Sequence, residues 1–286
     1  MLINGHRIAK VARQQIELQA TAYTRLDSFF RFVWRYDTPP HIELLIECLQ
    51  ALEDGEFDRF MVIEPPGHAK STVTTLAFPT WYIGRHPDHS IIGATTTGTL
   101  AELYTDAIGE VIESDLRYRG VFPKVRPDLK RGWSKKGLFV TRPYRPGQKD
   151  ATLAMVGAGG PIIGRRSDLM IIDDAVDQPV ARSELMLAQR VEWVRQSVRT
   201  RLKPGGKLVM SGTVWAEADV MNTMRDLGTF VVLIMRALSD TQQVYAELEI
   251  PDGIAWRPAG AIEYDPDVAG TRALTPGQTY IHEPVI

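Results

Sequence analysis

The chain has 286 residues, of which 44% are apolar and 24% charged, and its formal net charge is −2. This composition is ordinary for a globular protein of one or two domains, and the net charge alone indicates no nucleic-acid partner. No apolar run reaches the roughly 18 residues that span a bilayer, and the N-terminus lacks the apolar core of a secretory signal. We therefore expect no membrane contact and a cytoplasmic location. The single cysteine, Cys48, can form no internal disulfide and is expected to be a core residue.

Residues 41–79 predict a helix, a strand and a second helix in succession. The segment 41–53 places its apolar side chains at three- and four-residue spacing, which is typical of an amphipathic helix. The apolar run FDRFMVIE predicts a short strand, and a proline-rich loop follows it. A helix is expected to start at Ser71. Pro79 must end or kink it by Phe78, because proline lacks the N–H that an inner helical turn requires.

The middle of the chain predicts three strands and another helix. HSIIGA (89–94) is expected to be a short strand, and a helix should follow through LAELYTDAIGEVIE. GLFVT and ATLAMVG predict two strands of a hairpin around the turn RPYRPGQKD.

The last predicted elements begin with SDLMIIDDA, where four consecutive apolar residues lead into two aspartates. This pattern is typical of a central parallel strand that ends in a cleft. Further elements follow in this order: a helix over roughly 182–202, the turn KPGGK, the strand LVMSGT, a helix from near Glu217, and the strand FVVLIMRAL. From Ser239 onward the pattern weakens into a tail rich in proline and glycine. Strands alternating with helices predict an α/β fold with a central, mostly parallel sheet flanked by helices.

The loop after the first strand resembles a phosphate-binding loop, G-x-x-x-x-G-K-[ST]. Lys70 and Ser71 are in place, but Glu64 and Ala69 stand where the two glycines are expected. The backbone N–H groups of residues 66–71 would cradle the β- and γ-phosphates of a nucleotide. Lys70 would add a positive charge and the Ser71 hydroxyl would reach Mg²⁺.

Two other strand ends supply groups that complete such a site, because ligands of parallel sheets bind at the carboxyl ends of the strands. Asp173 would hold the water shell of the metal and Asp174 would polarise the attacking water. Thr213 and Trp215 would sense the γ-phosphate. Two aspartates after a strand can also cap a helix, so the prediction rests on the ordered set of all three strand ends.

Two stretches are locally basic although the whole chain is not. Residues 117–136 hold eight lysines and arginines against the single acid Asp128, and residues 190–207 hold six against Glu192 alone. Both stretches are candidates to follow a phosphate backbone, the first slightly favoured. The alternative is a solvated basic surface.

The chain resembles the large terminase subunits of tailed double-stranded DNA bacteriophages over about residues 35–235. The motifs of this resemblance are PPHIELLIECLQAL, MVIEPPGHAKS, SIIGATTTGTLAEL, RYRGVFP, IIGRRSDLMIIDD, RTRLKPGGK and SGTVWAEADV. The resemblance implies a P-loop NTPase of the additional-strand, conserved-glutamate (ASCE) type that uses ATP and Mg²⁺. It also implies a homo-oligomeric, pentameric ring on the capsid, with double-stranded DNA, the portal protein and the small terminase subunit as partners.

The resemblance also implies residue roles. Asp174 matches the catalytic carboxylate, Ser71 and Asp173 match the metal-holding residues, and Ser211 to Thr213 match the motif that couples hydrolysis to movement. The nucleotide-binding residues would be Pro66, Gly67, His68, Ala69, Lys70, Ser71, Thr72, Thr213 and, on the adenine side, His41. Arg165 or Arg166 falls where an arginine finger would reach a neighbouring subunit. His41 could equally begin a helix, and the two arginines could be surface charges.

The sequence departs from the family pattern at five positions. Ala69 replaces the loop glycine, which costs on the order of 1 kcal/mol if that position needs a positive φ. Gly67 replaces an arginine that some relatives have, and Asp174 is one methylene shorter than glutamate. Val214 and Ala216 occupy the Arg and His positions of the coupling motif. These departures predict slow or partner-dependent hydrolysis.

We expect an N-terminal helical extension at 1–34, a P-loop ATPase domain at 35–238 and a C-terminal tail or linker at 239–286. The nuclease domain of complete large terminases is not expected in this chain, and we predict no nuclease activity. The predicted function is the motor of viral DNA packaging, acting in the host bacterial cytoplasm during virion assembly and absent from the mature virion. The alternatives are a nucleotide-binding assembly module with little hydrolysis and a helicase-like DNA-dependent ATPase.

Overall fold

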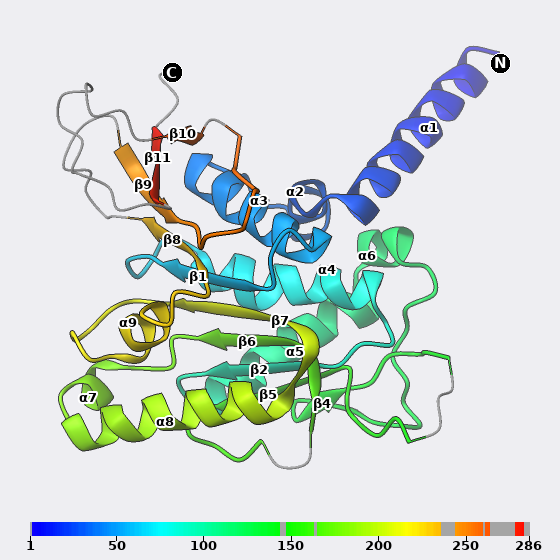
Figure 1. Cartoon of the computed structure of the whole chain (residues 1–286). Coiled ribbons are helices and arrows are strands. Elements are labelled where there is room, and N and C mark those ends of the chain that lie inside the picture. The colour runs from blue at the N-terminus through cyan, green and yellow to red at the C-terminus, as the bar shows by residue number, and fades with distance from the viewer. Residues whose placement is uncertain are drawn as a thin grey trace.

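The computed structural model describes residues 2–143, 147–162, 165–235, 244–259, 261–263 and 278–282. Within these ranges one sheet of eleven strands forms the centre, in the order β10-β11-β9-β8-β1-β7-β6-β2-β5-β4-β3 (Figure 1). The strands are β1 (Arg59–Ile63), β2 (Ile91–Thr95), β3 (Trp133–Ser134), β4 (Gly137–Leu138), β5 (Leu153–Gly157), β6 (Ser167–Asp173), β7 (Leu202–Gly212), β8 (Val231–Met235), β9 (Val244–Glu249), β10 (Ala261–Glu263) and β11 (Gln278–His282).

The middle of the sheet is parallel and its two margins are antiparallel. Strands β8, β1, β7, β6, β2 and β5 run in the same direction. The strand that leads into the lysine loop, β1, is separated from the aspartate strand, β6, by β7. The predicted α/β fold with a central, mostly parallel sheet is confirmed, and the additional strand lies where the predicted ASCE type requires one.

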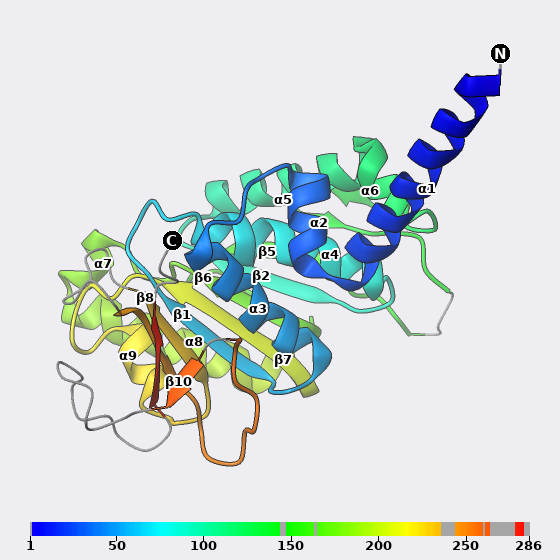
Figure 2. The same ribbon diagram turned by 90° about the horizontal axis from the view of Figure 1, so that it is seen from above.

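Helices cover both faces of the sheet (Figures 1 and 2). The helical segments are α1 (Leu2–Thr24), α2 (Leu26–Phe29), the π-helix η1 (Phe30–Trp34), α3 (Pro40–Asp54), the π-helix η2 (Thr72–Ala77), α4 (Phe78–Arg85), α5 (Gly98–Ser114), α6 (Leu116–Val121), α7 (Gln178–Ala181), α8 (Glu184–Arg201) and α9 (Val220–Arg225). None of the described helices combines the length and apolar character needed to cross a bilayer.

Alternation along the strands divides the core into two layers, because successive strand side chains point to opposite faces. Phe60 and Val62 of β1 pack with the helices α2 to α6, whereas Met61 packs with α7 to α9. Ile171 and Ile172 of β6 divide between the layers in the same way. The predicted core position of Cys48 is confirmed, since its side chain is fully buried in the first layer.

The first helix reaches away from this body, and only its C-terminal end touches it (Figures 1 and 2). The Trp81 indole N–H donates to the Ala22 carbonyl at 3.1 Å, and Ala22 is fully buried. The side chains of residues 12–18 are exposed, Ile16 and Leu18 among them. The predicted boundary of an N-terminal extension at residue 34 stays a prediction.

Of the two outcomes predicted for the second helix by Phe78, an end or a kink, the helix does not end there. The π-helix η2 passes directly into α4, which continues to Arg85. Pro79 lies in the first turn of α4, where its missing N–H removes little because helix-start N–H groups lack intrahelical partners. The proline therefore marks a change of helix type.

Two other segments differ from the sequence pattern. The predicted turn KPGGK lies inside the bounds of β7. Leu202 pairs with Ser167 and Lys207 with Leu169 of β6, and residues 203–206 bulge out between these two pairs. After residue 239, where the pattern weakened, β9 pairs antiparallel with β8 and extends the sheet together with β10 and β11. The predicted antiparallel pairing of β4 and β5 is confirmed, although residues 144–146 of its turn lie outside the described residues.

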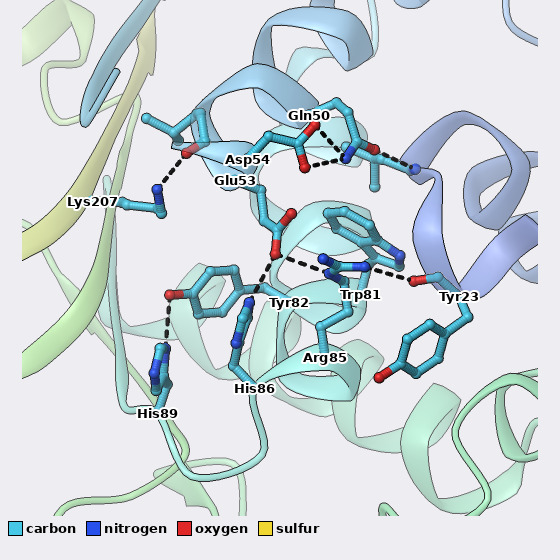
Figure 3. Close-up of polar contacts among 12 residues, drawn as sticks. Tyr23, Gln50, Glu53, Asp54, Trp81, Tyr82, Arg85, His86, His89 and Lys207 are labelled. Carbon is cyan, nitrogen blue, oxygen red and sulfur yellow. Dashed lines mark hydrogen bonds and ion pairs between the residues drawn. The ribbon is translucent and has the colours of Figure 1, made fainter. Parts of the chain in front are cut away.

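A buried polar cluster joins the C-terminal ends of α3 and α4 (Figure 3). The Glu53 carboxylate accepts hydrogen bonds from Arg85 Nε at 2.9 Å and His86 Nε2 at 2.8 Å. The Tyr82 hydroxyl lies 2.9 Å from His89 Nδ1, and the rings of His86 and His89 stack. Burial raises the pKa of Glu53, but the hydrogen bonds from His86 and Arg85 outweigh it and lower the pKa to about 2. This cluster fixes the two helices against each other.

Candidate active site

The loop after β1 adopts the left-handed backbone that a phosphate-binding loop requires. Gly67 has φ +88° and Ala69 has φ +66°. Position 69 therefore has the positive φ at which a Cβ lowers stability by on the order of 1 kcal/mol. Lys70 follows with only 5% of its surface exposed, although lysine is rarely buried without a partner. The loop therefore presents a buried ammonium group at the carboxyl edge of the sheet.

Asp173 ends β6 inside the protein. Its side chain is 1% exposed, and Oδ1 accepts a hydrogen bond from Ser211 Oγ of β7 at 2.6 Å. Burial raises the pKa of Asp173 and the neighbouring charge of Asp174 adds to the rise, while hydrogen bonds from Ser211, Ser71 and Thr75 oppose it. The carboxylate and the Ser71 hydroxyl therefore lie together, as the predicted metal role requires.

Asp174 is the group on which the lysine loop, β6 and β7 converge. Its Oδ2 lies 3.1 Å from Lys70 Nζ, and its Oδ1 accepts the Thr213 N–H at 3.2 Å. The backbone N–H of Asp174 donates to the Ser211 carbonyl at 2.8 Å, and its carbonyl accepts the Thr96 hydroxyl at 2.9 Å. These contacts hold Asp174 in a left-handed conformation with φ +45°, which a non-glycine residue adopts at a cost.

Two residues that the sequence interpretation missed, Thr74 and Tyr104, hold the site residues in place through hydroxyl hydrogen bonds. Thr74 Oγ1 donates to the Lys70 carbonyl at 2.9 Å and to Ser211 Oγ at 3.2 Å, which ties the start of η2 to β7. Tyr104 of α5 hydrogen-bonds Ser71, and burial followed by the nearby charge of Asp173 raises the pKa of its hydroxyl. No motif marks either residue, and only the packing of α5 and η2 on the sheet reveals them.

Glu64 occupies the first glycine position of the loop as a buried acid. The residue is 2% exposed, and its Oε2 has no hydrogen-bond partner among the described residues. Burial raises the pKa of Glu64 to about 7, against the opposing charges of His68 and Lys70. Its backbone is fixed to β7, because its carbonyl accepts the Thr213 hydroxyl at 3.1 Å.

His41 lies beside the loop, as its predicted nucleotide-side position requires. Its ring meets the His68 ring edge to face, with centroids 6.2 Å apart. Burial lowers the pKa of His41 and the nearby His68 lowers it further. His41 also occupies the first turn of α3, so the structure is compatible with both roles left open for it. Pro66 and Gly67 are exposed at the tip of the loop, and Thr72 is half-buried at the start of η2.

The two arginines are not brought to this centre. Arg165 lines a cleft at the ends of β2 and β5, and Arg166 is exposed beside it. Within the described residues, neither hydrogen-bonds with Lys70, Asp173 or Asp174. Their predicted finger role concerns a neighbouring subunit and stays a prediction.

The donor set fits a magnesium ion bound together with a nucleotide. No group of three or more His, Cys, Asp and Glu side chains that could hold a metal occurs in the described part of the chain. Mg²⁺ in nucleotide sites takes one or two carboxylates and fills its shell with phosphate oxygens and water. Asp173 with Ser71 is such a set.

Fold and site together define an α/β protein with a buried lysine and two carboxylates at one edge of a mostly parallel sheet. No family model matches the chain, and no curated protein sequence matches it. Among solved structures the chain is similar to the crystal structure of the HK97 bacteriophage large terminase, with a TM-score of 0.47 and 12% sequence identity. That likeness covers 72% of this chain and 41% of the other, so the chain spans less than half the length of the protein it matches.

Proposed function

We propose that this chain is an ATPase that drives the packaging of double-stranded DNA into a viral procapsid. The observation that supports the ATPase most strongly is the contact between Lys70 and Asp174, whose strand ends are separated in the sheet by β7. A buried ammonium group, two carboxylates and a hydroxyl on one sheet edge match what phosphoryl transfer to water requires. The packaging role rests on the motifs of the terminase resemblance.

In this proposal the loop residues bind the phosphates of ATP. The backbone N–H groups of residues 67–71 would donate to the β- and γ-phosphates, and Lys70 would hold the γ-phosphate by its charge. Ser71 and Asp173 would hold Mg²⁺, which would supply positive charge to the phosphate oxygens. Lys70 must leave Asp174 to reach the phosphate, so nucleotide binding breaks the ion pair observed here.

Release from Lys70 gives Asp174 its catalytic function. Its free oxygen orients the attacking water and accepts the proton, which is general base catalysis. The other oxygen stays bound to the Thr213 N–H of the coupling motif. A change in the charge around Asp174 during hydrolysis therefore acts directly on the segment after β7, which moves the gripped DNA in this proposal.

The wider assembly follows from the resemblance. The chain would form a pentameric ring with the portal protein and the small terminase subunit, in the host cytoplasm during assembly. Arg165 or Arg166 would act on the nucleotide of the neighbouring subunit. DNA would be held through its backbone, because transport of a whole genome requires contacts without sequence preference.

One observation favours a second candidate, a nucleotide-binding assembly module with little hydrolysis. The left-handed Ala69 narrows the loop beside the phosphate, and Asp174 is short. Steady-state phosphate release by the chain, with and without DNA, distinguishes the two. The motor predicts DNA-dependent turnover that Asp174→Asn abolishes, and the assembly module predicts ATP-dependent oligomers that survive Asp174→Asn. No turnover in wild type under either condition would contradict the motor.

A further inference from the structure

The fold already uses most cations of the favoured basic stretch, 117–136. Arg117 donates to the Phe32 carbonyl at 3.0 Å and Arg126 donates to the Val125 carbonyl at 2.7 Å. Arg119 and Arg131 donate to the carbonyls of Glu113 and Gln148. These arginines hold loops of the protein together. Among the described residues, the side chains of Lys124, Lys130 and Lys136 form neither a hydrogen bond nor an ion pair.

Lys136 is the member of this set that lines a cavity. A cleft of about 490 Å³ lies where β2 and β5 end, and Lys135, Lys136 and Arg165 contribute its cationic side chains. Lys135 is partly neutralised by Asp106 at 2.9 Å. Arg165 comes from a different part of the chain, so cations from two loops converge on one hollow. Glu102 is the acidic residue on its rim.

Backbone groups add to the positive character of this cleft. The first turn of α5 opens into it at Gly98, and the free N–H groups of a helix start attract anions. This helix start is pressed against Gly157 of β5, where an added Cβ would lie 2.5 Å from the Gly98 nitrogen. The close approach fixes the helix start at the wall of the cleft.

The cleft is also connected to the catalytic aspartate. Thr96, which lines the cleft, donates its hydroxyl to the Asp174 carbonyl at 2.9 Å. The adjoining wall is fixed by the bond from the Ala158 N–H to the Thr95 carbonyl at 2.6 Å. A ligand that shifts the β2 end therefore acts on the backbone of Asp174 through a single hydrogen bond.

We propose that this cleft binds backbone phosphates of double-stranded DNA and that Thr96 transmits its occupancy to Asp174. The inference rests on the proposed function, which requires a DNA grip without sequence preference. Lysine and arginine around a hollow suit phosphodiester oxygens, and no base needs to enter. DNA bound in this cleft would contact Thr96, which is hydrogen-bonded to Asp174. This contact would give DNA a route by which it controls turnover.

The other basic stretch offers a less suitable surface. Arg190, Lys203 and Lys207 are held by the Ala175 carbonyl, Asp168 and the Leu52 carbonyl. Arg195 and Arg199 are exposed on α8 without a partner among the described residues, and they line none of the clefts described for this chain. The exposed face of α8 with Arg195 and Arg199 is therefore the alternative DNA-binding surface in the test.

The test measures the affinity of the full chain for a labelled DNA duplex, by fluorescence anisotropy without nucleotide, over a range of salt concentrations. Lys136→Ala combined with Arg165→Ala should weaken binding about tenfold at low salt and reduce the slope of log K against log salt by about 2, roughly one for each lost phosphate contact. Glu102→Gln should strengthen binding. Lys124→Ala combined with Lys130→Ala removes the same charge outside the cleft and should change the affinity much less.

Several results of this binding experiment would contradict the proposal. An unchanged slope in the Lys136/Arg165 variant, or an equal loss in the Lys124/Lys130 control, would overturn the cleft as the DNA site. So would a loss that appears only with Arg195→Ala and Arg199→Ala. Displacement of the duplex by inorganic phosphate at constant ionic strength would assign the cleft to free phosphate.

The coupling is tested separately from the grip. Measured at saturating DNA, Thr96→Val should lose the stimulation of ATP hydrolysis by DNA whatever it does to DNA affinity, and Thr96→Ser should restore the stimulation. Full stimulation in Thr96→Val would refute the transmission. Failure of the proposed function is distinguishable, because wild type would then hydrolyse no ATP whatever the cleft variants do to DNA binding.

Discussion

The Lys70 ammonium lies 3.1 Å from the Asp174 carboxylate, although their strands, β1 and β6, are not neighbours in the sheet. The register explains the meeting. Ile63 pairs with Gly212 and Asp173 pairs with Ser211, so β1, β6 and β7 end at the same level. The residue that would bind phosphate and the residue that would activate water therefore form an ion pair.

Asp174→Asn should separate binding from chemistry. The amide cannot accept a proton, so turnover should fall about 100-fold or more. The amide also lacks the charge that competes for Lys70, so affinity for a non-hydrolysable ATP analogue should equal or exceed that of wild type. Phosphate release and a binding titration measure the two quantities. A variant that loses analogue binding as well would show that Asp174 acts in binding and not in water activation.

Ala69→Gly should relieve strain in the loop. Ala69 has φ +66°, where glycine is favoured by about 1 kcal/mol, so the variant should melt roughly 2 °C higher and turn over faster. Gly67→Ala is the matched control, because Gly67 has φ +88° with open space around an added Cβ. The control should be destabilised by a similar amount. An Ala69→Gly protein with lower stability would mean that the loop prefers the alanine.

Glu64 predicts a pH dependence of stability with a definite sign. Its pKa of about 7 in the folded state exceeds the ordinary glutamate pKa of 4.5. The folded state therefore binds more protons, and stability falls as the pH rises from 4.5 to 7 and then levels off. Glu64→Gln cannot ionise, so it should be more stable than wild type at pH 8, by on the order of 1–3 kcal/mol, and similar at pH 4. Urea unfolding at both pH values measures this, and a variant less stable at pH 8 would contradict it.

Glu53 predicts the opposite dependence. Its pKa of about 2 lies below the ordinary glutamate pKa of 4.5, so its contribution to stability is complete above pH 4.5 and is lost as the pH falls towards 2. Glu53→Gln should destabilise the protein by about 2 kcal/mol at pH 7, because Arg85 and His86 lose a buried charged partner. The difference from wild type should shrink at acid pH. Glu56→Gln, at an exposed neighbouring position, is the control, and an equal effect there would contradict the prediction.

Local patterns predicted the centre of the fold, and tertiary packing decided the rest. The apolar runs of β1 and β6, and the polar residues that end them, were enough to predict a parallel sheet with Lys70 and Asp174 at one edge. Tyr104 was missed because its contact depends on how α5 packs on the sheet. Thr96 was missed because its bond to the Asp174 carbonyl depends on the end of β2 lying beside β6. Strands β10 and β11 are short and pair with each other and β9, so their sequence has no long alternating pattern. An end or a kink was predicted at Pro79, and the change from π-helix to α-helix found there has no sequence signal that we could use.

The central claim is that the loop after β1 and the end of β6 bind the terminal phosphates of ATP with magnesium. Calorimetric titration of a non-hydrolysable ATP analogue, with and without Mg²⁺, into wild type and Lys70→Ala tests it most directly. The account predicts magnesium-dependent binding in wild type that Lys70→Ala loses. Absence of magnesium-dependent heat in wild type, or equal binding in Lys70→Ala, would contradict it.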